Sequence, residues 1–532
     1  PLSFAQQRMW FLNQFDPASC AYHIVHAFRL SGDLDIDVLR AAVRDLVGRH
    51  EALRTVFPVV DGEPLQSIVP IRDMADVVTG PVAVDGTAGL WDAVREFAAR
   101  GFDVTTDVPI RVLVCAVTET VHVLVLVVHH IASDGLSKMP LARDMVIAYT
   151  ARSSGAEPVW EPLAVQYADY TLWQRKTLGD SADPSSPAAG DEAFWLRELA
   201  GVPHVIELPS DRRRPENPSY AGGVVEFAVA AELTSAIYMQ ARQHGVTVFM
   251  VLHAALAVLL TKLARTDDVV IGTPVAGRAE GALDDVVGMF VNTIPLRTSV
   301  HPQQSFTDLL EAVRETDLAA FTHAELPFER IVDVVQPQRS TAHNPLFQIM
   351  LAFHNLPETV FELPGLRIED INIPDVTSKF DLEWIFTEIS QGRGRVTQLN
   401  GKLVFPTDLF DTTTVVAFRD RFLRVLTEAI THPLRRVGEI DLLSASERTA
   451  LLVDRNNTTV PIPEETLASL FQRQARRSPS AVAVVDATTE LSYAEFSGRV
   501  NRLARWLIGH GVGPESLVAI VLPRSVRFVE CA

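Results

Sequence analysis

The stretch Val121-His-Val-Leu-Val-Leu-Val-Val-His-His-Ile-Ala-Ser-Asp-Gly135 decides the fold of this chain. Residues 121–128 are apolar at every position but one, which predicts a strand buried on both faces. Two histidines follow at the end of the strand, and an aspartate and a glycine follow in a turn. Titratable groups at the edge of a core are typical of a catalytic site, so the stretch also marks a place for chemistry.

The geometry of a strand separates the two histidines. Successive side chains point to opposite faces, so we expect one of His129 and His130 to face a site and the other to pack into the scaffold. Asp134 is too close in sequence to be a charge-relay partner, and we expect it to pair with a buried arginine. Gly135 permits a tight backbone approach or a positive φ, and its amide near a helix start favours developing negative charge.

The residues alone leave a plainer interpretation open. A histidine in a strand is commonly a packed or a surface residue. A metal site is a further possibility, but no second cluster of His, Cys, Asp or Glu at ligand spacing accompanies the motif. We therefore expect no metal, and both the catalytic and the packed interpretation stand at this point.

Composition limits the classes of partner and the cellular setting that we expect for the protein. The 532 residues suffice for about two to four domains. The formal charge of −19 argues against a nucleic-acid partner. The three cysteines lie far apart, which predicts a reducing, cytoplasmic setting without a disulfide framework. No run approaches the roughly 20 apolar residues of a membrane span, so we expect no membrane partner.

Helical and strand patterns occur in two sets, which predicts two α/β subdomains. A segment rich in Ser, Pro, Ala and Asp at 180–190 is expected to be a flexible surface loop between them. Composition changes again near 456–463, and the start of a separate α/β domain follows. Since the chain begins at Pro1 and ends after a strand-like run, we interpret it as a piece of a longer polypeptide. The expected helices are 35–47, 89–100, 136–151, 231–244, 246–265, 305–322, 412–431, 467–476 and 493–509; the expected strands are 53–60, 65–70, 110–117, 121–130, 269–271, 347–353, 379–389, 401–404, 481–485 and 517–522.

The histidine motif resembles the His-His-x-x-x-Asp-Gly signature of condensation domains of nonribosomal peptide synthetases, which share a fold with chloramphenicol acetyltransferase. The tail Leu491-Ser-Tyr-Ala-Glu-Phe496 is similar to the first core motif of an adenylation domain. In the seventh condensation motif Ala342-His343 replaces the usual polar-basic pair. The other motifs stand in family order: Ser3-Phe-Ala-Gln-Gln-Arg-Met-Trp10, Arg49-His-Glu-Ala-Leu-Arg-Thr-Val-Phe57, Tyr167-Ala-Asp-Tyr-Thr-Leu-Trp173, Val287-Gly-Met-Phe-Val-Asn-Thr-Ile-Pro-Leu-Arg297, His323-Ala-Glu-Leu-Pro-Phe-Glu329 and Arg339-Ser-Thr-Ala-His-Asn-Pro-Leu346.

The resemblance implies an α/β fold. Two chloramphenicol-acetyltransferase-like subdomains are expected to form a V-shaped pseudo-dimer with a central channel, followed by a partial α/β N-terminus of an adenylation domain. The implied boundaries are an N-terminal condensation subdomain at 1–178, a C-terminal condensation subdomain at 179–440, a linker at 441–463 and the truncated adenylation domain at 464–532.

The resemblance also implies a reaction. The amine of an acceptor aminoacyl thioester attacks a donor acyl or peptidyl thioester and forms an amide, as a step in secondary metabolism such as antibiotic or siderophore biosynthesis. The first and second motifs resemble the type that accepts an L-configured donor. Heterocyclising relatives carry Asp in place of the histidines and are disfavoured. The alternatives are an epimerisation-type relative, an inactive recruitment module, and a stand-alone acyltransferase that uses coenzyme A.

The implied partners are the upstream donor and downstream acceptor peptidyl carrier domains and the adjoining adenylation domain. No cofactor is expected in the chain itself, because both substrates travel on 4′-phosphopantetheine arms of the carriers. Nucleic acid and membrane are not expected as partners.

Family roles can be carried onto matching residues. His130 is expected in the channel, either as the base that accepts the amine proton or as a group that positions the amine and stabilises the tetrahedral intermediate. His129 is expected in the scaffold, and Asp134 is expected to pair with Arg278, with Arg111 as the second candidate. Gly135 is expected either to allow the backbone geometry of the turn or to contact the oxyanion. The remaining candidates are Arg8 and Trp10 near the channel, with a core position favoured for Trp10; Asn292 and Thr293 in the channel floor, with a structural role equally open; and Ser378 on the acceptor side.

Overall fold

The computed structural model describes residues 1–338, 340, 342–354, 362–363, 365–371, 376–391, 395–462 and 464–532. Arg339 and Thr341 of the seventh motif, and Pro463 at the end of the expected linker, lie outside the described residues. The described chain divides into two compact units, Pro1–Leu443 and Ser444–Ala532.

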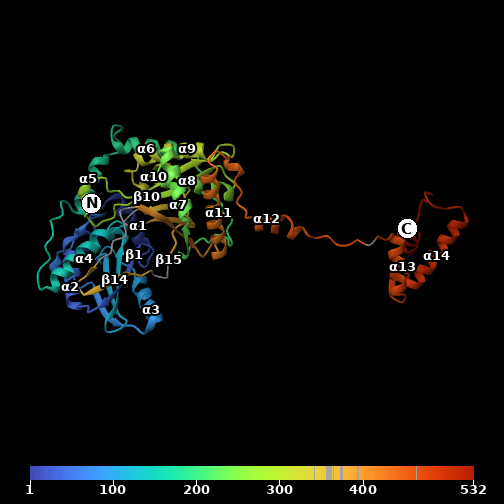
Figure 1. Cartoon of the computed structure of the whole chain (residues 1–532), viewed down its shortest axis with the longest axis horizontal. Helices are drawn as coiled ribbons and strands as arrows, with labels where there is room; N and C mark the ends of the chain where they lie inside the picture. Colours follow the sequence, from blue (N-terminus) through green and yellow to red (C-terminus); the bar gives the residue numbers. More distant parts are fainter. Residues whose placement is uncertain are drawn as a thin grey trace. The chain divides into compact units, whose positions relative to one another are not determined.

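A six-stranded sheet forms the centre of the N-terminal half of the first unit (Figure 1). The predicted strand is β8 (Val121–His129), and it lies between two antiparallel neighbours, as its continuous apolar run requires. Val123, Val125 and Val127 are fully buried. The strand order is β13 (Glu362–Leu363), β14 (Leu366–Asp370), β1 (His23–Gly32), β8, β7 (Ile110–Ala116) and β6 (Val78–Ala83).

Helices with amphipathic patterns cover this sheet. In α2 (Ile36–Arg49) the apolar residues recur at helical spacing and are buried. The Asp35 side chain caps the helix by accepting the N–H groups of Asp37 and Val38. Helix α2 packs on α4 (Lys138–Ser153), while α3 (Gly86–Ala99) contacts β7 and α1 (Phe4–Phe15) contacts the short turn after β8.

The C-terminal half is built around a seven-stranded sheet and one predominantly apolar helix. Helix α8 (Val248–Ala264) begins after the cap Thr247, and nearly all of it is buried. It packs against α9 (Phe306–Thr322) and α11 (Thr412–Thr431), and α7 (Ala231–His244) precedes it. The strand order is β11 (Asn292–Ser299), β10 (Asp268–Val275), β12 (Ile349–His354), β16 (Leu382–Gln391), β17 (Arg395–Pro406), β9 (Ala221–Val229) and β15 (Val376–Thr377).

Two segments of the C-terminal half belong to the core of the N-terminal half. Strand β14 pairs with β1, so it completes the first sheet although it follows most of the second sheet in sequence. Residues 283–290 pack into the same core through Leu283, Val286, Val287 and Phe290. Residues on both sides of the proposed boundary at 178 therefore share one core, and the two halves of the first unit are interlocked.

Two local expectations are wrong. The segment 180–190 is not wholly a flexible loop, because α6 (Pro187–Glu198) starts within it, with Pro187 in the first turn and the Ser186 hydroxyl accepting the Ala189 N–H. Residues 517–522 form no strand. Leu517 and Val521 are almost completely exposed, and no described strand lies beside them to complete a hydrogen-bonded ladder.

The second unit has a small core of its own. Helix α14 (Tyr493–Gly509) packs on α13 (Leu467–Arg477) and on the β18 (Val482–Val485) and β19 (Glu490–Ser492) hairpin. Leu491, Phe496 and Val526 are its buried apolar residues. The unit also contains α12 (Ala445–Leu452) and α15 (Val526–Cys531).

Within the described residues, no single helix has the length and apolar composition needed to cross a membrane. Helices α7 and α8 meet both conditions only as a pair, and they are bent by 104° at the break between them.

Candidate active site

His129 ends β8 and packs into the scaffold. It faces His23 in the register of β1 and β8, and its ring is edge-on to Phe102 at a centroid distance of 5.9 Å. Its side chain is buried, and its Nδ1 accepts the backbone N–H of Ile131 at 3.2 Å. This bond places the proton of the neutral ring on Nε2. Burial lowers the pKa of His129 to about 3, with His23 acting in the same direction, so the ring is neutral at physiological pH.

His130 starts the short 3₁₀ turn His130–Ala132 and differs from His129 in its contacts. Its backbone N–H donates to the Tyr22 carbonyl at 2.8 Å, whereas its ring Nδ1 has no hydrogen-bond partner among the described residues. No protein bond therefore fixes its tautomer at Nδ1. Burial lowers the pKa of His130 to about 4, and the positive charge of Lys379 adds to the shift. At neutral pH the ring is uncharged and can accept a hydrogen bond.

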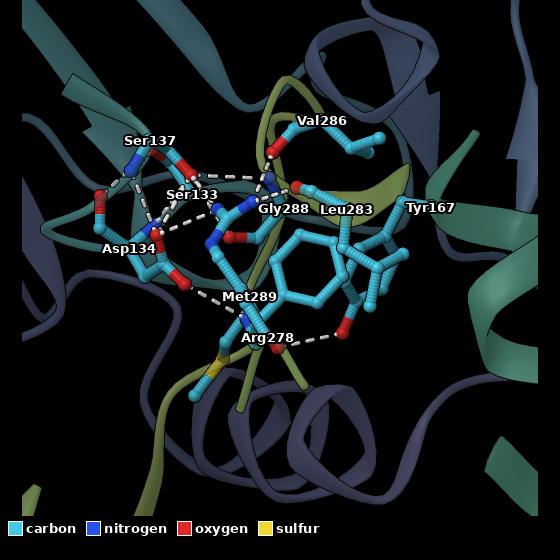
Figure 2. A network of polar contacts seen from close by, with 10 residues as sticks. Ser133, Asp134, Ser137, Tyr167, Arg278, Leu283, Val286, Gly288 and Met289 are labelled. Carbon is cyan, nitrogen blue, oxygen red and sulfur yellow. Dashed lines mark hydrogen bonds and ion pairs between the residues drawn. The ribbon is translucent and has the colours of Figure 1, made fainter. Parts of the chain in front are cut away.

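Asp134 lies in the centre of a buried polar network (Figure 2). Its Oδ1 accepts the backbone N–H of Ser137 at 2.9 Å and the Ser137 hydroxyl at 2.8 Å. Its Oδ2 accepts the N–H of Phe290 at 3.0 Å. Arg278 Nη2 lies 3.2 Å from Oδ1, which makes Arg278 the ion-pair partner of Asp134. The carboxylate is thus held by protein groups on both oxygens.

Arg278 connects the histidine loop with residues 283–290 (Figure 2). Its Nη1 donates to the carbonyls of Leu283 and Val286, and its guanidinium lies 4.1 Å from the centroid of the Phe290 ring. Only 5% of its side chain is exposed. Arg111, the second candidate, lies elsewhere: it donates to the Gly101 carbonyl and stacks on Phe102. We call Asp134, Ser137 and Arg278 the buried brace.

Sequence reasoning gave no role to Ser137 or Tyr167, which support this network. The Ser137 hydroxyl donates to Asp134 and also lies 3.1 Å from the Gly288 carbonyl and 3.2 Å from the Gly288 N–H. The Tyr167 hydroxyl donates to the Met289 carbonyl at 2.7 Å. A serine three residues after an aspartate is a recognisable local capping pattern, but its contact with Gly288 depends on the tertiary fold.

Gly135 is exposed, and its structure does not require a glycine. Its φ is not positive, and a Cβ added to it would meet no atom within 4 Å. Gly135 therefore has neither the positive φ nor the close approach to another part of the protein that would require a glycine. The space beside its Cα is open.

A matched pair of glycine substitutions tests this contrast. Gly135→Ala is expected to leave the melting temperature of the first unit unchanged, because the new methyl group enters open space. Gly288→Ala is expected to lower it by several degrees, since its Cβ would lie 2.0 Å from the Tyr167 ring. Thermal unfolding followed by circular dichroism measures both. A large loss of stability in Gly135→Ala would contradict the open position described here.

Arg8 and Asn292 join elements at the contact between the halves. Arg8, in α1, donates to Glu329 at 3.3 Å, and Glu329 lies in α10 (Phe328–Val335). The Asn292 amide donates to the carbonyls of Ala324 and Leu326, both at 2.8 Å, and its oxygen accepts the Phe328 N–H. Asn292 is therefore a structural link with little hydrogen-bonding capacity left for a substrate.

The other candidates are held within the fold. Thr293 lies in β11 opposite Pro274 and is partly buried. The Ser378 side chain is buried and donates to the Phe380 carbonyl at 2.8 Å, so it is occupied locally. Trp10 is partly buried, and its indole N–H donates to the Phe57 carbonyl.

A pocket that opens to solvent lies beside the buried brace. It is lined by residues from both halves, among them Tyr167, Arg278, Asn292 and Glu325. Burial raises the pKa of the Glu325 carboxyl, and Asp191 contributes in the same direction. No group of three or more metal-ligating side chains is found in the part of the chain that the structure describes. The structure therefore offers a hollow with a mixed polar and apolar lining next to Arg278 of the buried brace, shaped by both halves.

Comparison with protein families assigns both units. The family described as "Condensation domain" matches residues 1–452, and the family described as "AMP-binding enzyme" matches residues 471–532.

Curated relatives match along 99% of the chain. A probable non-canonical nonribosomal peptide synthetase, CymA of Salinispora arenicola, is 45% identical, and a dimodular nonribosomal peptide synthase of Bacillus subtilis is 43% identical. An isonitrile lipopeptide synthase of Mycobacterium tuberculosis is 40% identical. The chain spans only 7%, 22% and 21% of these three proteins.

Solved structures share the fold. The X-domain from teicoplanin biosynthesis is 32% identical with a TM-score of 0.78, covering 83% of this chain and 97% of the X-domain. A four-domain nonribosomal peptide synthetase, holo-AB3403, has a TM-score of 0.81 at 22% identity over 96% of this chain and 39% of its own, which bears on the fold alone. The fold is thus the mixed α/β, chloramphenicol-acetyltransferase-like fold of condensation domains, followed by the start of an adenylation domain.

Proposed function

Because this chain belongs to the condensation-domain family of amide-bond-forming acyltransferases, we propose that its first unit joins an acceptor aminoacyl thioester to a donor acyl or peptidyl thioester. The observation that carries the proposal is the pair of histidines at the end of β8. One is locked in the scaffold, and the other has a neutral ring whose buried Nδ1 forms no hydrogen bond within the described residues.

The proposed chemistry is a transfer between two thioesters. The acceptor amine attacks the donor carbonyl carbon, a C–N bond forms, and the C–S bond breaks with its electron pair going to sulfur. The proton lost by the amine ends on the released thiol. Since a thioester is already activated, much of the rate comes from holding amine and carbonyl in near-attack geometry.

His130 fits this reaction as the group that contacts the amine. With a pKa lowered to about 4 it is a weak base, and it remains neutral under working conditions. A neutral imidazole can accept a hydrogen bond from the amine, position it and stabilise the tetrahedral intermediate. The buried brace keeps the loop that carries His130 in place and leaves Asp134 no proton-transfer role.

We further propose that both substrates arrive on 4′-phosphopantetheine arms of an upstream donor and a downstream acceptor carrier domain, with the adenylation domain that starts in the second unit beside them. The match of that unit to the AMP-binding family supports this arrangement. We propose an L-configured donor from the first two motifs. All three cysteines are free thiols, which supports a cytoplasmic setting.

A recruitment module is the second candidate. The observation that favours it is the likeness to the X-domain, which has been solved in complex with OxyB and is 31% identical to this chain. The synthetase relatives are more similar and extend over nearly the whole chain, so condensation remains the first candidate.

A reconstitution assay separates the two candidates. The whole chain, mixed with a donor carrier loaded with an aminoacyl thioester and an acceptor carrier loaded with a second one, is expected to place a dipeptide on the acceptor arm. Intact-protein mass spectrometry detects this product. If neither an L- nor a D-configured donor gives product while the chain still binds both carriers, condensation is wrong and recruitment gains support.

A further inference from the structure

The proposed reaction leaves one residue near His130 without a role. Lys379 was expected at the start of a strand, but β16 begins only at Leu382, and Lys379 lies in the loop between β15 and β16. Its Nζ lies 4.4 Å from the centroid of the Tyr22 ring, in the other half of the unit. The Tyr22 carbonyl in turn accepts the backbone N–H of His130. The lysine therefore contacts the residue that anchors His130.

The loop that carries Lys379 is fixed on both sides. The Ser378 N–H donates to the Tyr220 carbonyl, and the Asn344 side-chain amide donates to the carbonyl of Lys379 itself. The Phe380 ring stacks on Phe347 of the C-terminal core at 5.8 Å. These contacts hold the lysine backbone in one place and leave only its side chain to reach across to Tyr22.

The ammonium group lies in an environment that does not favour a charge. Among the described residues, no carboxylate lies within ion-pair distance of its Nζ. Burial lowers the pKa of Lys379 to about 8, Glu383 opposes the shift, and Arg8 adds to it. A partly buried cation whose main contact is an aromatic face costs stability unless it has another purpose, and such groups are typical of functional sites.

We propose that Lys379 is a positioning residue of the condensation reaction, which acts through His130 by holding a positive charge beside the loop that presents the imidazole. The inference rests on the proposed function of His130. A nearby positive charge disfavours the imidazolium, so it extends to lower pH the range in which the ring can accept a hydrogen bond from the attacking amine.

Other charged groups near His130 also affect its pKa. Arg8, from α1, acts in the same direction as Lys379, whereas Asp134, from the loop after the turn, acts in the opposite one. His129 is the titratable neighbour in sequence, and its own low pKa keeps it neutral. Glu329 pairs with Arg8, and Glu383 faces Lys379 from β16. After burial itself, Lys379 is the largest of the charges that lower the pKa of His130.

The sign of the effect follows directly. Removing the Lys379 charge raises the pKa of His130 from about 4 toward its ordinary value of 6.5. Burial remains, so we expect a rise that stops short of the ordinary value. Protonation of His130 is expected to reduce activity at acidic pH. In a variant without the lysine charge, this loss of activity is expected at higher pH, by the same amount.

Nuclear magnetic resonance of histidine-labelled chain tests this directly. The His130 signal is assigned by its absence in His130→Gln, and its pKa is measured in Lys379→Met and Lys379→Gln, which remove the charge at similar length. Lys379→Arg keeps the charge, and Lys176→Met removes an exposed lysine on α5 (Tyr167–Leu178). We expect a raised pKa in the two neutral variants and the wild-type value in the two controls. A wild-type His130 pKa in both neutral variants overturns the inference.

The condensation rate against pH completes the experiment. Lys379→Met is expected to shift the acid limb upward relative to wild type, while Lys379→Arg retains the wild-type profile. A uniform loss at every pH in both variants would indicate a merely structural role and overturn the inference. The resonance measurement needs no activity, so an inactive wild-type chain would refute the proposed function without affecting the electrostatic result. Thermal unfolding of each variant verifies that it folds.

Discussion

Replacing His130 with alanine is expected to reduce the condensation rate by roughly 100- to 10,000-fold, the range typical of a lost acid–base or hydrogen-bonding group. The variant removes the histidine of the pair whose ring Nδ1 forms no hydrogen bond within the described residues, whereas Nδ1 of His129 accepts one. Thioester activation remains, and so does the positioning of the two arms, so a residual rate above the uncatalysed one is expected. Single-turnover assays with loaded donor and acceptor carriers measure the effect.

Two controls make this result specific. His432→Ala removes an exposed histidine at the end of α11 and is expected to keep the wild-type rate. His130→Ala is expected to keep the melting temperature of the first unit, because the His130 ring forms no side-chain hydrogen bond at Nδ1 that the fold would lose. A His130→Ala variant with the full wild-type rate would show that the site is assigned to the wrong residue.

Replacing Asp134 with alanine is expected to destabilise the first unit by about 3–5 kcal/mol, because it leaves the buried Arg278 charge without its partner. Arg278→Ala is expected to cost a similar amount, since Asp134 then loses its counter-ion and the 283–290 segment loses two carbonyl contacts. Denaturant unfolding of each variant measures the loss. Activity falls in both variants as a consequence of the displaced loop, without a direct part in the chemistry.

The double variant separates pairing from other effects. If the pair acts as a unit, Asp134→Ala with Arg278→Ala costs clearly less than the sum of the two single losses. Asp92→Ala breaks an exposed ion pair with Arg95 on α3 and is expected to change stability by less than about 1 kcal/mol. A loss in Asp134→Ala no larger than this control would contradict the bracing role of the carboxylate.

Much of the secondary structure follows from local pattern. The apolar run of β8 and the helical spacing in α2, α9 and α11 need no tertiary information, because burial imposes the same period on each element wherever it packs. The run at 517–522 shows where this reasoning ends. Its apolar residues fit a strand equally well, yet a strand forms only beside a partner that supplies its hydrogen bonds.

The residues of the candidate site also differ in whether the sequence alone could predict their roles. Strand alternation predicted that only one of the two neighbouring histidines faces the site, and the resemblance to the condensation-domain family selected His130. The short turn predicted that Asp134 is directed away from the histidines. The roles of Gly135, Asn292 and Ser378 depended on what lies beside them, and the structure gives them open space, three structural hydrogen bonds and a local hydrogen bond, respectively. Lys379 carries no local signal at all, because its meaning comes from Tyr22, which is distant in sequence.

The sequence by itself therefore determined the family, the buried strand β8 and the pair of histidines at its end. Each of these depends on residue order over a few positions, which the chain carries in full. Only the tertiary structure decided that β14 and residues 283–290 complete the N-terminal core and that Ser137 and Lys379 lie beside the histidine loop. Such contacts join segments that are far apart in the chain. They depend on the shape and charge of the packed surfaces, which cannot be predicted from the order of neighbouring residues.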